Sequence, residues 1–218
     1  MRGRTVNAGN AHTPDERVVR TLKALKRNEF LAYFYPAADE AKRFVLESVQ
    51  EGMRVGLAGS ATIREMSLVE GLRKKGARLL DHWDESLTIE ETLQVRKEQL
   101  LCDVLLSSVN AVTEQGELVS RDGIGNRTSA MTFGPTKVFL LAGTQKIVPD
   151  LAAAFRRIDE VAAPMRARSL NIDLPCTKGK GCVNCHDPDR ICRATLVLHR
   201  RPLLTDITVI LIGEPLGY

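Results

Sequence analysis

The amino-acid sequence predicts an α/β protein with a mainly parallel sheet sandwiched by helices, in a Rossmann-like arrangement. Two observations lead to this prediction. Short apolar runs of strand length alternate with amphipathic helical segments along the 218 residues, and the connections between them are short. Apolar residues make up 44% of the chain and charged residues 27%, as in an ordinary soluble protein with one substantial core.

The first part of the chain is expected to begin with a tail and a capped helix. Residues 1–12 are expected to form a flexible tail. Thr13 is the expected N-cap of the first helix, with Pro14 as its first helical residue. Gly76 is expected to end the third helix. Strands are then expected at residues 30–34, 54–58 and 77–80, and helices at 14–25, 41–48 and 62–75.

The second part continues the alternation of strands and helices. The long helix expected at 149–170 has an apolar face that includes Ala154, Ile158 and Met165. The chain shows neither an internal repeat nor a low-complexity linker, so residues 13–218 are expected to form one domain. The remaining elements are a helix at 89–100, strands at 103–107 and 136–142, and two closing strands at 195–198 and 207–212 that could be antiparallel to each other.

Hydropathy and charge argue against a membrane-spanning, an exported or a nucleic-acid-binding protein. The longest apolar runs, such as residues 138–142, are too short to cross a bilayer, and the N-terminus lacks a hydrophobic signal core, so a cytoplasmic location is expected. The net charge is +4, but residues 156–201 contain ten Lys/Arg and five Asp/Glu. This basic segment indicates an anionic ligand or an acidic partner, or else a solvated helix face. Few aromatic residues accompany it, which disfavours nucleic acid.

A glycine- and hydroxyl-containing turn joins the strand at 54–58 to the next helix. Gly59, Ser60 and Thr62 there can present backbone N–H groups and hydroxyls to a phosphate or carboxylate. The alternative is simple capping by Ser60, with the glycines serving the turn. The turn has neither the Walker sequence nor the G-x-G-x-x-G pattern, so it does not identify a nucleotide.

Residues 110–127 follow the strand at 103–107 and are rich in amide, carboxylate, guanidinium and glycine groups. Ligands bind at strand ends in open α/β sheets. Gln115 and Gly116 predict a hairpin turn that brings the later residues back toward the strand end. Glu114 is the candidate catalytic base or nucleophile, and a structural Glu–Arg pair is the alternative. The expected ligand-binding residues are Asn110, Thr113, Gly125, Asn126 and Arg127.

Four of the five cysteines lie in a loop at residues 175–193. They are Cys176, Cys182, Cys185 and Cys192. One C-x-x-C pair with two further thiols predicts a metal, either zinc or an iron–sulfur cluster. Free thiols and disulfides are the alternatives, and a cytosolic location disfavours disulfides. Cys102 stands alone beside an expected strand and is interpreted as core packing.

These motifs together resemble the LUD-domain (lactate-utilisation) family, related to lactate utilisation protein C. The resemblance covers residues 17–218. The cysteine loop and the ending of the chain resemble those of the short, stand-alone members of the family. It implies a NagB/RpiA/CoA-transferase-like fold, in which an early strand–helix loop contacts an anionic group. Some CoA transferases use a glutamate nucleophile, but the motif around Glu114 departs from theirs. The motifs that carry the resemblance are residues 55–62, 110–116 and 125–127, the cysteine loop, and the ending at 213–218.

The resemblance implies a role in oxidising lactate to pyruvate, beside iron–sulfur partner proteins. The leading hypothesis is therefore a protein that binds a small anionic metabolite or nucleotide and acts with an iron–sulfur redox system, with a metal in its cysteine loop. Two alternatives stay open. One is a transferase, isomerase or cyclo-ligase that uses Glu114. The other is a non-enzymatic subunit whose basic C-terminal region docks an acidic partner.

Overall fold

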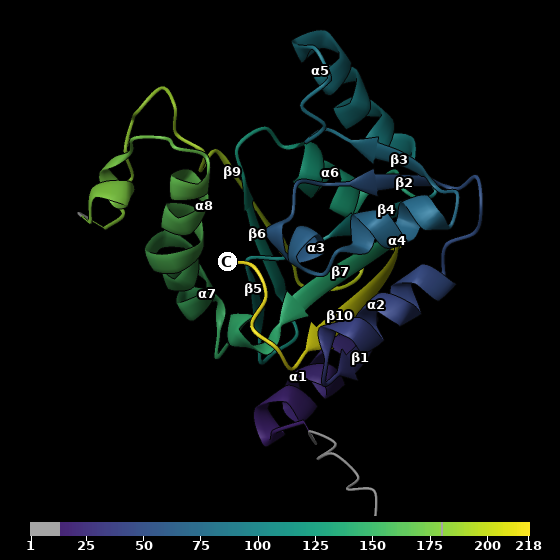
Figure 1. The fold of residues 1–218 in the computed structure, drawn as a ribbon. Coiled ribbons are helices and arrows are strands. Elements are labelled where there is room, and N and C mark those ends of the chain that lie inside the picture. Colours follow the sequence, from purple (N-terminus) through teal and green to yellow (C-terminus); the bar gives the residue numbers. More distant parts are fainter. Residues whose placement is uncertain (1–13, 180) are drawn as a thin grey trace, which may run out of the picture.

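The computed structural model describes residues 14–179 and 181–218, and it contains two β-sheets (Figure 1). In the larger sheet all neighbouring strands are parallel. The predicted α/β class with a mainly parallel sheet is confirmed, whereas the expected tail at 1–12 lies outside the described residues. The strands of the larger sheet, in spatial order, are β1 (Leu31–Tyr35), β10 (Asp206–Ile212), β7 (Lys137–Gly143), β4 (Val104–Ser107), β2 (Arg54–Leu57) and β3 (Arg78–Asp81).

The smaller sheet covers part of one face of the larger sheet. Its centre is the hairpin predicted from Gln115 and Gly116, in which β5 and β6 are antiparallel. Leu118 of this sheet and Leu105 of β4 belong to the same buried cluster, so the two sheets share a core. The strands of the smaller sheet, in spatial order, are β8 (Ile147–Val148), β5 (Ala111–Thr113), β6 (Leu118–Asp122) and β9 (Ala194–Leu198).

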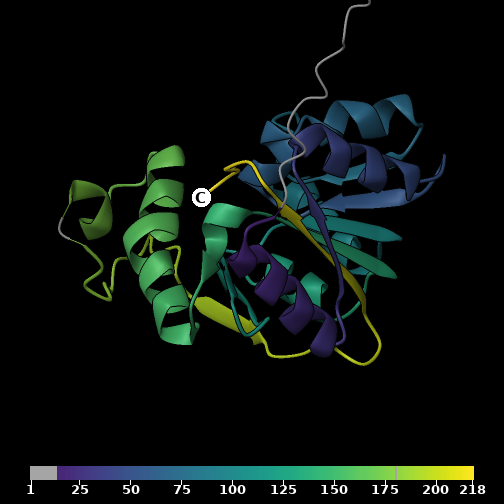
Figure 2. The ribbon, with the colours of Figure 1, turned by 90° about the horizontal axis from the view of Figure 1, so that it is seen from below.

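Helices cover both faces of the larger sheet. Figure 2 shows α2, α3 and α4 on one side and α1 on the other. In β7, Phe139 and Leu141 face the first group, while Val138 and Leu140 face α1 and the smaller sheet, because successive side chains of a strand point to opposite faces. The helices are α1 (Glu16–Arg27), α2 (Ala38–Glu47), α3 (Ala61–Glu65), α4 (Leu68–Lys74), α5 (Ile89–Glu98), α6 (Asn126–Thr132), α7 (Leu151–Arg157) and α8 (Ala163–Ser169).

Two helix predictions at the N-terminal side were wrong in detail. Helix α1 begins at Glu16, and its N-cap is Asp15, whose Oδ1 accepts a hydrogen bond from the Val18 N–H at 2.8 Å. Thr13, the expected cap, lies outside the described residues. The helix expected at 62–75 is broken into α3 and α4 because Ser67 adopts a left-handed conformation with φ of 49°. Gly76 follows the end of α4, as predicted.

The long helix expected at 149–170 contains a π-helical turn between α7 and α8, at Ile158–Ala162. Pro164 lies just after this turn; it has no N–H to donate and its ring would crowd the preceding turn of an α-helix. The wider turn places one extra residue in the helix and rotates the following side chains. Met165, expected on the apolar face, is therefore 40% exposed.

The expected antiparallel pairing of the two closing strands was also wrong. Strand β9 pairs antiparallel with β6 in the smaller sheet, whereas β10 lies between β1 and β7 in the larger sheet and is parallel to both. Cys102 is buried in the core shared by the two sheets, as predicted. No helix within residues 14–179 and 181–218 has the length and apolar character needed to cross a membrane.

Candidate functional site

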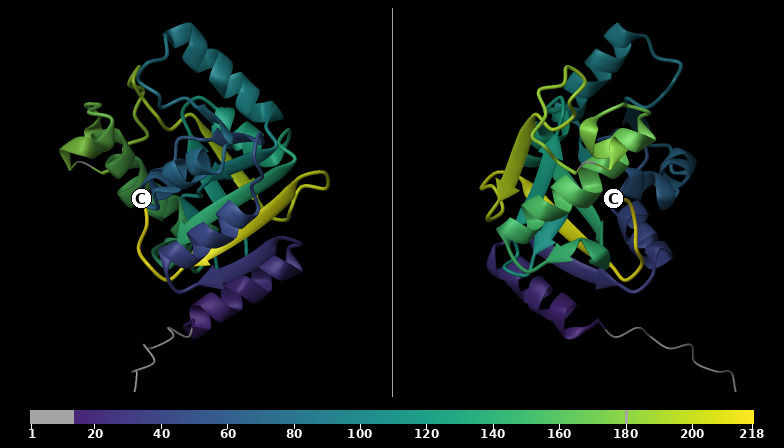
Figure 3. Two further views of the ribbon diagram at one scale, coloured as in Figure 1. Left: turned by 45° about the vertical axis from the view of Figure 1, so that its right-hand side comes forward. Right: turned by 90° about the vertical axis from the view of Figure 1, so that its left-hand side faces the viewer.

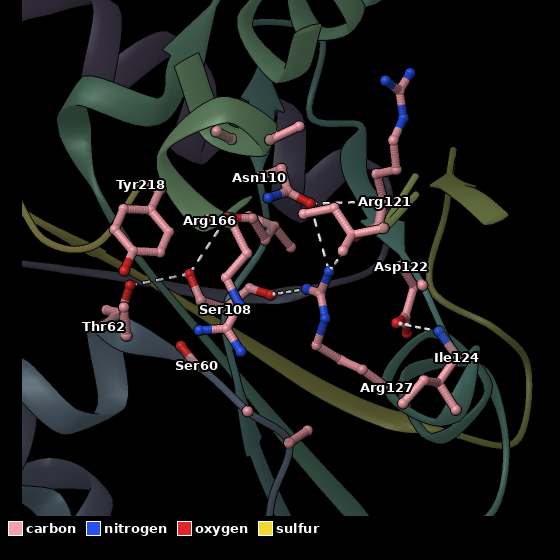
Figure 4. A pocket seen from close by; sticks show the side chains of 18 of the residues that line it. Ser60, Thr62, Ser108, Asn110, Arg121, Asp122, Ile124, Arg127, Arg166 and Tyr218 are labelled. Atoms are coloured by element: carbon pink, nitrogen blue, oxygen red, sulfur yellow. Dashed lines mark hydrogen bonds between the residues drawn. The ribbon is translucent and has the colours of Figure 1, made fainter. Parts of the chain in front are cut away.

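The carboxyl ends of the parallel strands border a cavity of about 410 Å³, which is within the range of small-molecule sites. Residues that follow β2, β3, β4, β7 and β10 line it, and helix α8 closes the opposite side. Figure 4 shows Thr62, Ser108, Arg127, Arg166 and Tyr218 around this space. Parallel strands bring their carboxyl ends to one edge of the sheet, so residues far apart in the sequence meet here.

The turn after β2 requires glycine at position 59. Gly59 has φ of +60°, and a Cβ there would lie 3.0 Å from His82 Nε2 and 3.1 Å from Trp83 Nε1. The two rings therefore pack against this turn. The Ser60 side chain accepts a hydrogen bond from the Ile63 N–H at 3.4 Å, as the capping interpretation requires, and Thr62 is buried beside the cavity.

Arg127 ties the hairpin to the end of β4. Its Nη1 donates to the Ser108 carbonyl at 2.8 Å, and its Nη2 donates to the Arg121 carbonyl at 2.7 Å and to Asn110 Oδ1 at 3.4 Å. These acceptors are neutral, so they hold the guanidinium in place without cancelling its charge. Burial lowers the pKa of Arg127, and the nearby Asp122 carboxylate partly offsets this effect.

Lys146 lies in the short 3₁₀ turn after β7 and is only 2% exposed. Its Nζ donates to Thr62 Oγ1 at 3.1 Å and to Ser108 Oγ at 3.0 Å. Burial, together with the charges of Arg157 and Arg127, lowers the pKa of Lys146 to about 7, and Glu65 opposes them. The site therefore favours the uncharged amine more than an exposed lysine does.

Arg166 and Arg96 add further positive charge to the cavity wall. The Arg166 guanidinium, from α8, stacks on Trp83 with 4.7 Å to the ring centroid, while Arg64 stacks on the same ring at 5.1 Å. Arg96 also lines the cavity, and its buried Nε has no hydrogen-bond partner within the described part of the chain. A buried donor without an acceptor is costly, so the Arg96 Nε is available to donate to a bound acceptor.

His82 is a neutral component of the wall. Burial, followed by the charge of Arg96, lowers the pKa of His82 to about 4, against the effect of Asp81. Its Nδ1 is 2.9 Å from Gln99 Nε2, which also donates to the Leu57 and Leu80 carbonyls. The Gln99 amide is thus a donor toward His82, whose Nδ1 accepts.

Six of the nine residues expected in the ligand or catalytic site line this one cavity. They are Gly59, Ser60, Thr62, Asn110, Asn126 and Arg127. Asn126 Nδ2 is 3.4 Å from Gln99 Oε1, so it joins the network around His82. The Asn110 side-chain oxygen accepts from the Arg121 N–H at 2.7 Å, and this bond fixes the hairpin.

The other three expected residues lie elsewhere. Glu114 is at the hairpin tip, where it forms an ion pair with Arg20 of α1 at 3.1 Å. The tip is held there by Asn28, whose side chain donates to the Gln115 and Gly116 carbonyls. Thr113 is buried in the hairpin and bonds to Glu117, and Gly125 begins α6 without lining the cavity.

The cysteine loop lies beside the cavity, and Cys192 is one of the lining residues. Burial raises the pKa of Cys176, and the nearby Cys185 and Cys182 raise it further. Burial also raises the pKa of Cys192, and Cys182 contributes to this rise. The four thiols are free. Within the described residues, no three His, Cys, Asp or Glu side chains are arranged to hold a metal ion.

Comparison with known families identifies the fold family. The LUD domain profile matches residues 18–212, which is nearly the whole chain. The chain belongs to the LUD-domain family. A DUF162 family protein from Deinococcus radiodurans has a similar fold, with a TM-score of 0.53, 14% sequence identity, and coverage of 91% of this chain and 97% of that chain.

Two other solved structures resemble this LUD-domain protein more weakly. The malonate decarboxylase alpha subunit from Acinetobacter baumannii has a TM-score of 0.40 and 11% identity, covering 93% of this chain and 39% of that chain. The eIF2B beta subunit from Chaetomium thermophilum has a TM-score of 0.37 and 16% identity, covering 52% of this chain and 43% of that chain. A search of curated proteins found no match.

Sequence reasoning missed several residues of the LUD-domain cavity. Lys146, Arg166, Arg96 and Trp83 are isolated in the sequence and form no motif with their neighbours. Signals for Lys146 and Trp83 were present, because each follows an expected strand closely, as the residues after β2 and β4 do. Arg96 and Arg166 come from helices α5 and α8, whose approach to the sheet edge depends on tertiary packing.

Replacing Gly59 with Ala tests the turn at the cavity. We expect a loss of about 1–2 kcal/mol in the free energy of unfolding, because alanine is strained at positive φ. The contact with the rings should also shift the emission of Trp83, the only tryptophan. Gly52→Ala is the control, because Gly52 has φ of +80° and no atom within 4 Å of an added Cβ. Identical emission from both variants would contradict the assigned packing.

Replacing Lys146 with Met tests the buried amine. The pKa of Lys146 falls from 10.5 to about 7 on folding, so between these pH values the unfolded chain binds a proton that the folded chain does not. The stability of the wild type relative to Lys146→Met should therefore rise from pH 7 to pH 10, by at most about 1.4 kcal/mol per pH unit. Urea unfolding measures this difference, with Lys74→Met at an exposed site as control. Parallel pH profiles for wild type and Lys146→Met would contradict the assignment.

Proposed function

We propose that this LUD-domain protein binds a small carboxylate-bearing metabolite in the cavity and acts in the oxidation of lactate or a related organic acid. The observation that carries the proposal is an excess of cationic side chains around the cavity. Five basic residues line the cavity, and Asp122 is the only acidic one among the described residues. An anionic ligand would balance this charge.

The protein's own carboxylates leave most of these cations unpaired. Arg121 forms an ion pair with Asp159, which removes it from the excess. Among the described residues, no carboxylate oxygen lies within 4.0 Å of the side-chain nitrogens of the four others. These four are Arg96, Arg127, Lys146 and Arg166. Partly or fully buried charges that lack a carboxylate partner are unfavourable, so binding of an anion here is favoured by the charges already in place.

The size and the remaining lining favour a small organic acid over a nucleotide. The cavity of about 410 Å³ also has apolar residues in its wall, among them Ile124, Ile158 and Leu170. Trp83, one of the aromatic side chains in the lining, already contacts Arg64 and Arg166 on its ring. A ligand with a charged end and a short carbon skeleton matches this combination.

Membership of the LUD-domain family supports the assignment to lactate utilisation. In this proposal the protein works beside an iron–sulfur partner, and the basic segment at 156–201 is the candidate docking region for an acidic surface. The location of Glu114 gives less support to a Glu114-dependent transferase, isomerase or cyclo-ligase. Its carboxylate pairs with Arg20 at the hairpin tip and does not line the cavity.

Replacing Arg166 with Met tests ligand binding. We expect pyruvate and lactate to bind the wild type and to change Trp83 fluorescence. Arg166→Met should weaken binding about ten- to hundredfold, the loss of a hydrogen-bonded charge pair worth roughly 1.5–3 kcal/mol. Calorimetric titration gives the dissociation constants independently of the altered Trp83 environment.

Arg168→Met is the matched control for this experiment. Arg168 lies on the same helix and carries the same charge, but it is exposed and does not line the cavity. Its replacement should leave the affinity for both acids within about twofold, because exposed charges are screened by solvent. Equal affinities for Arg166→Met and wild type would contradict the placement of the ligand. Tight binding of phosphate without binding of either acid would contradict a carboxylate ligand and indicate a phosphate-bearing one.

We also propose that the cysteine loop holds zinc or an iron–sulfur cluster. The donor chemistry supports this, because four thiols lie within 17 residues and several are close enough to affect one another's pKa. The described geometry does not itself bring three ligands together. Metal binding would therefore require the loop to draw its thiols closer.

Metal analysis after anaerobic purification tests this second proposal. We expect about one equivalent of zinc, or iron together with acid-labile sulfide, and loss of that metal when Cys182 and Cys185 are replaced with Ser. Cys102→Ser is the control, because Cys102 is buried in the core away from the loop. Metal content below a tenth of an equivalent, or equal content in the loop variant, would contradict the proposal.

A further inference from the structure

The amine of Lys146 is unusual in both its burial and its partners. Lysine is rarely buried unless it is paired with a carboxylate. Here the two hydrogen-bond partners of Nζ are the hydroxyls of Thr62 and Ser108, and no carboxylate lies within 4.0 Å among the described residues. A hydroxyl can accept a hydrogen bond from an ammonium or donate one to a free amine, so this setting accommodates both forms.

The chain segment after β10 shields this amine from solvent. Gln145 Nε2 donates to the Leu216 carbonyl at 2.9 Å, and the Gly217 N–H donates to Glu65 Oε2 at 2.7 Å. A Cβ at Gly217 would lie 3.1 Å from Lys146 Nζ and 2.3 Å from Thr62 Oγ1. The backbone thus passes directly over the amine, and Figure 3 shows this end of the chain beside α8. On the opposite side Lys146 is one of the residues that line the cavity.

The groups that face Lys146 favour the uncharged amine. Arg157 and Arg127 are the nearby cations, and their repulsion adds to the effect of burial; Glu65 is the nearby carboxylate that opposes them. An uncharged lysine amine is a nucleophile toward carbonyl carbon. Lys146 therefore combines a weakened preference for the charged form with a position in the cavity wall, at the site where we place the carboxylate ligand.

We propose that Lys146 condenses reversibly with the carbonyl of a small 2-oxo acid bound in the cavity. This inference rests on the proposed function, because the cations of the cavity hold the carboxylate. The Lys146 nitrogen adds to the ketone carbon and the carbonyl oxygen takes up a proton, giving a carbinolamine. Loss of water then gives the imine, with no change in oxidation state. The Ser108 and Thr62 hydroxyls, each within 3.1 Å of Nζ, carry the protons between nitrogen and oxygen.

The 2-oxo acid is the substrate class that satisfies both parts of the site. It carries a carboxylate beside a ketone, so one end matches Arg96 and Arg166 and the next carbon is the electrophile for Lys146. A 2-hydroxy acid has the same carboxylate but no electrophilic carbonyl. Both acids are therefore expected to bind, and only the 2-oxo acid is expected to condense with the amine.

Reductive trapping tests the proposal. The full chain is incubated with pyruvate and sodium cyanoborohydride near pH 7.5, digested, and analysed by mass spectrometry. Reduction of the imine leaves an adduct with the mass of the acid less one oxygen. We expect labelling of Lys146 at least about tenfold above that of exposed lysines, because a lysine with an ordinary pKa is almost fully protonated at this pH. Lactate should bind without labelling, and acetone, which lacks the carboxylate, should label weakly.

Two variants separate reaction from folding. Lys146→Arg should abolish the adduct at position 146. Lys137→Arg, at the other end of β7, should retain the Lys146 adduct in full. A pyruvate-induced change in Trp83 fluorescence without Lys146 labelling would overturn the condensation while leaving the proposed function intact. Absence of binding by either acid, together with absence of labelling, would overturn both. Uniform labelling of all lysines would also overturn the inference.

Discussion

The parallel pairing of β7 with β4 and β10 is the constraint on which the rest of the structure depends. These central strands are buried on both faces, so each must be covered by helices or by the smaller sheet. Parallel pairing also directs their carboxyl ends to one edge. The groups that follow them, among them Ser108 and Lys146, therefore meet at a shared cavity even though their strands are far apart in the sequence.

The sequence was sufficient to predict the elements that depend on local pattern. Alternating apolar runs predicted the strands of the larger sheet, and Gln115 and Gly116 predicted the hairpin between β5 and β6. The pairing of strands that are distant in the sequence could not be predicted as well. Strand β9 has the same apolar character as its neighbours in the sequence, but its partner is β6, more than 70 residues earlier, and no local signal specifies that choice.

The candidate site was predictable where residues form a motif and unpredictable where they act singly. The turn at Gly59 and the pair Asn126 and Arg127 are recognisable from composition, and they line the cavity. Lys146 and Arg166 acquire their significance only from burial and from the direction in which they point. Glu114 shows the opposite case: its sequence context indicated chemistry, while the packing of the hairpin tip on α1 gives it an ion pair with Arg20.

The π-helical turn at Ile158–Ala162 has a consequence for how the cavity is specified. An α-helix advances by about 100° per residue, so one extra residue changes the phase of everything that follows by that angle. The extra residue places Arg166 on the same face of the helix as Ile158, and both line the cavity. Met165 then faces solvent. The direction of this guanidinium is therefore encoded in the number of residues before it as much as in their identity. Within this helix a single-residue deletion would be a larger change to the cavity than most substitutions.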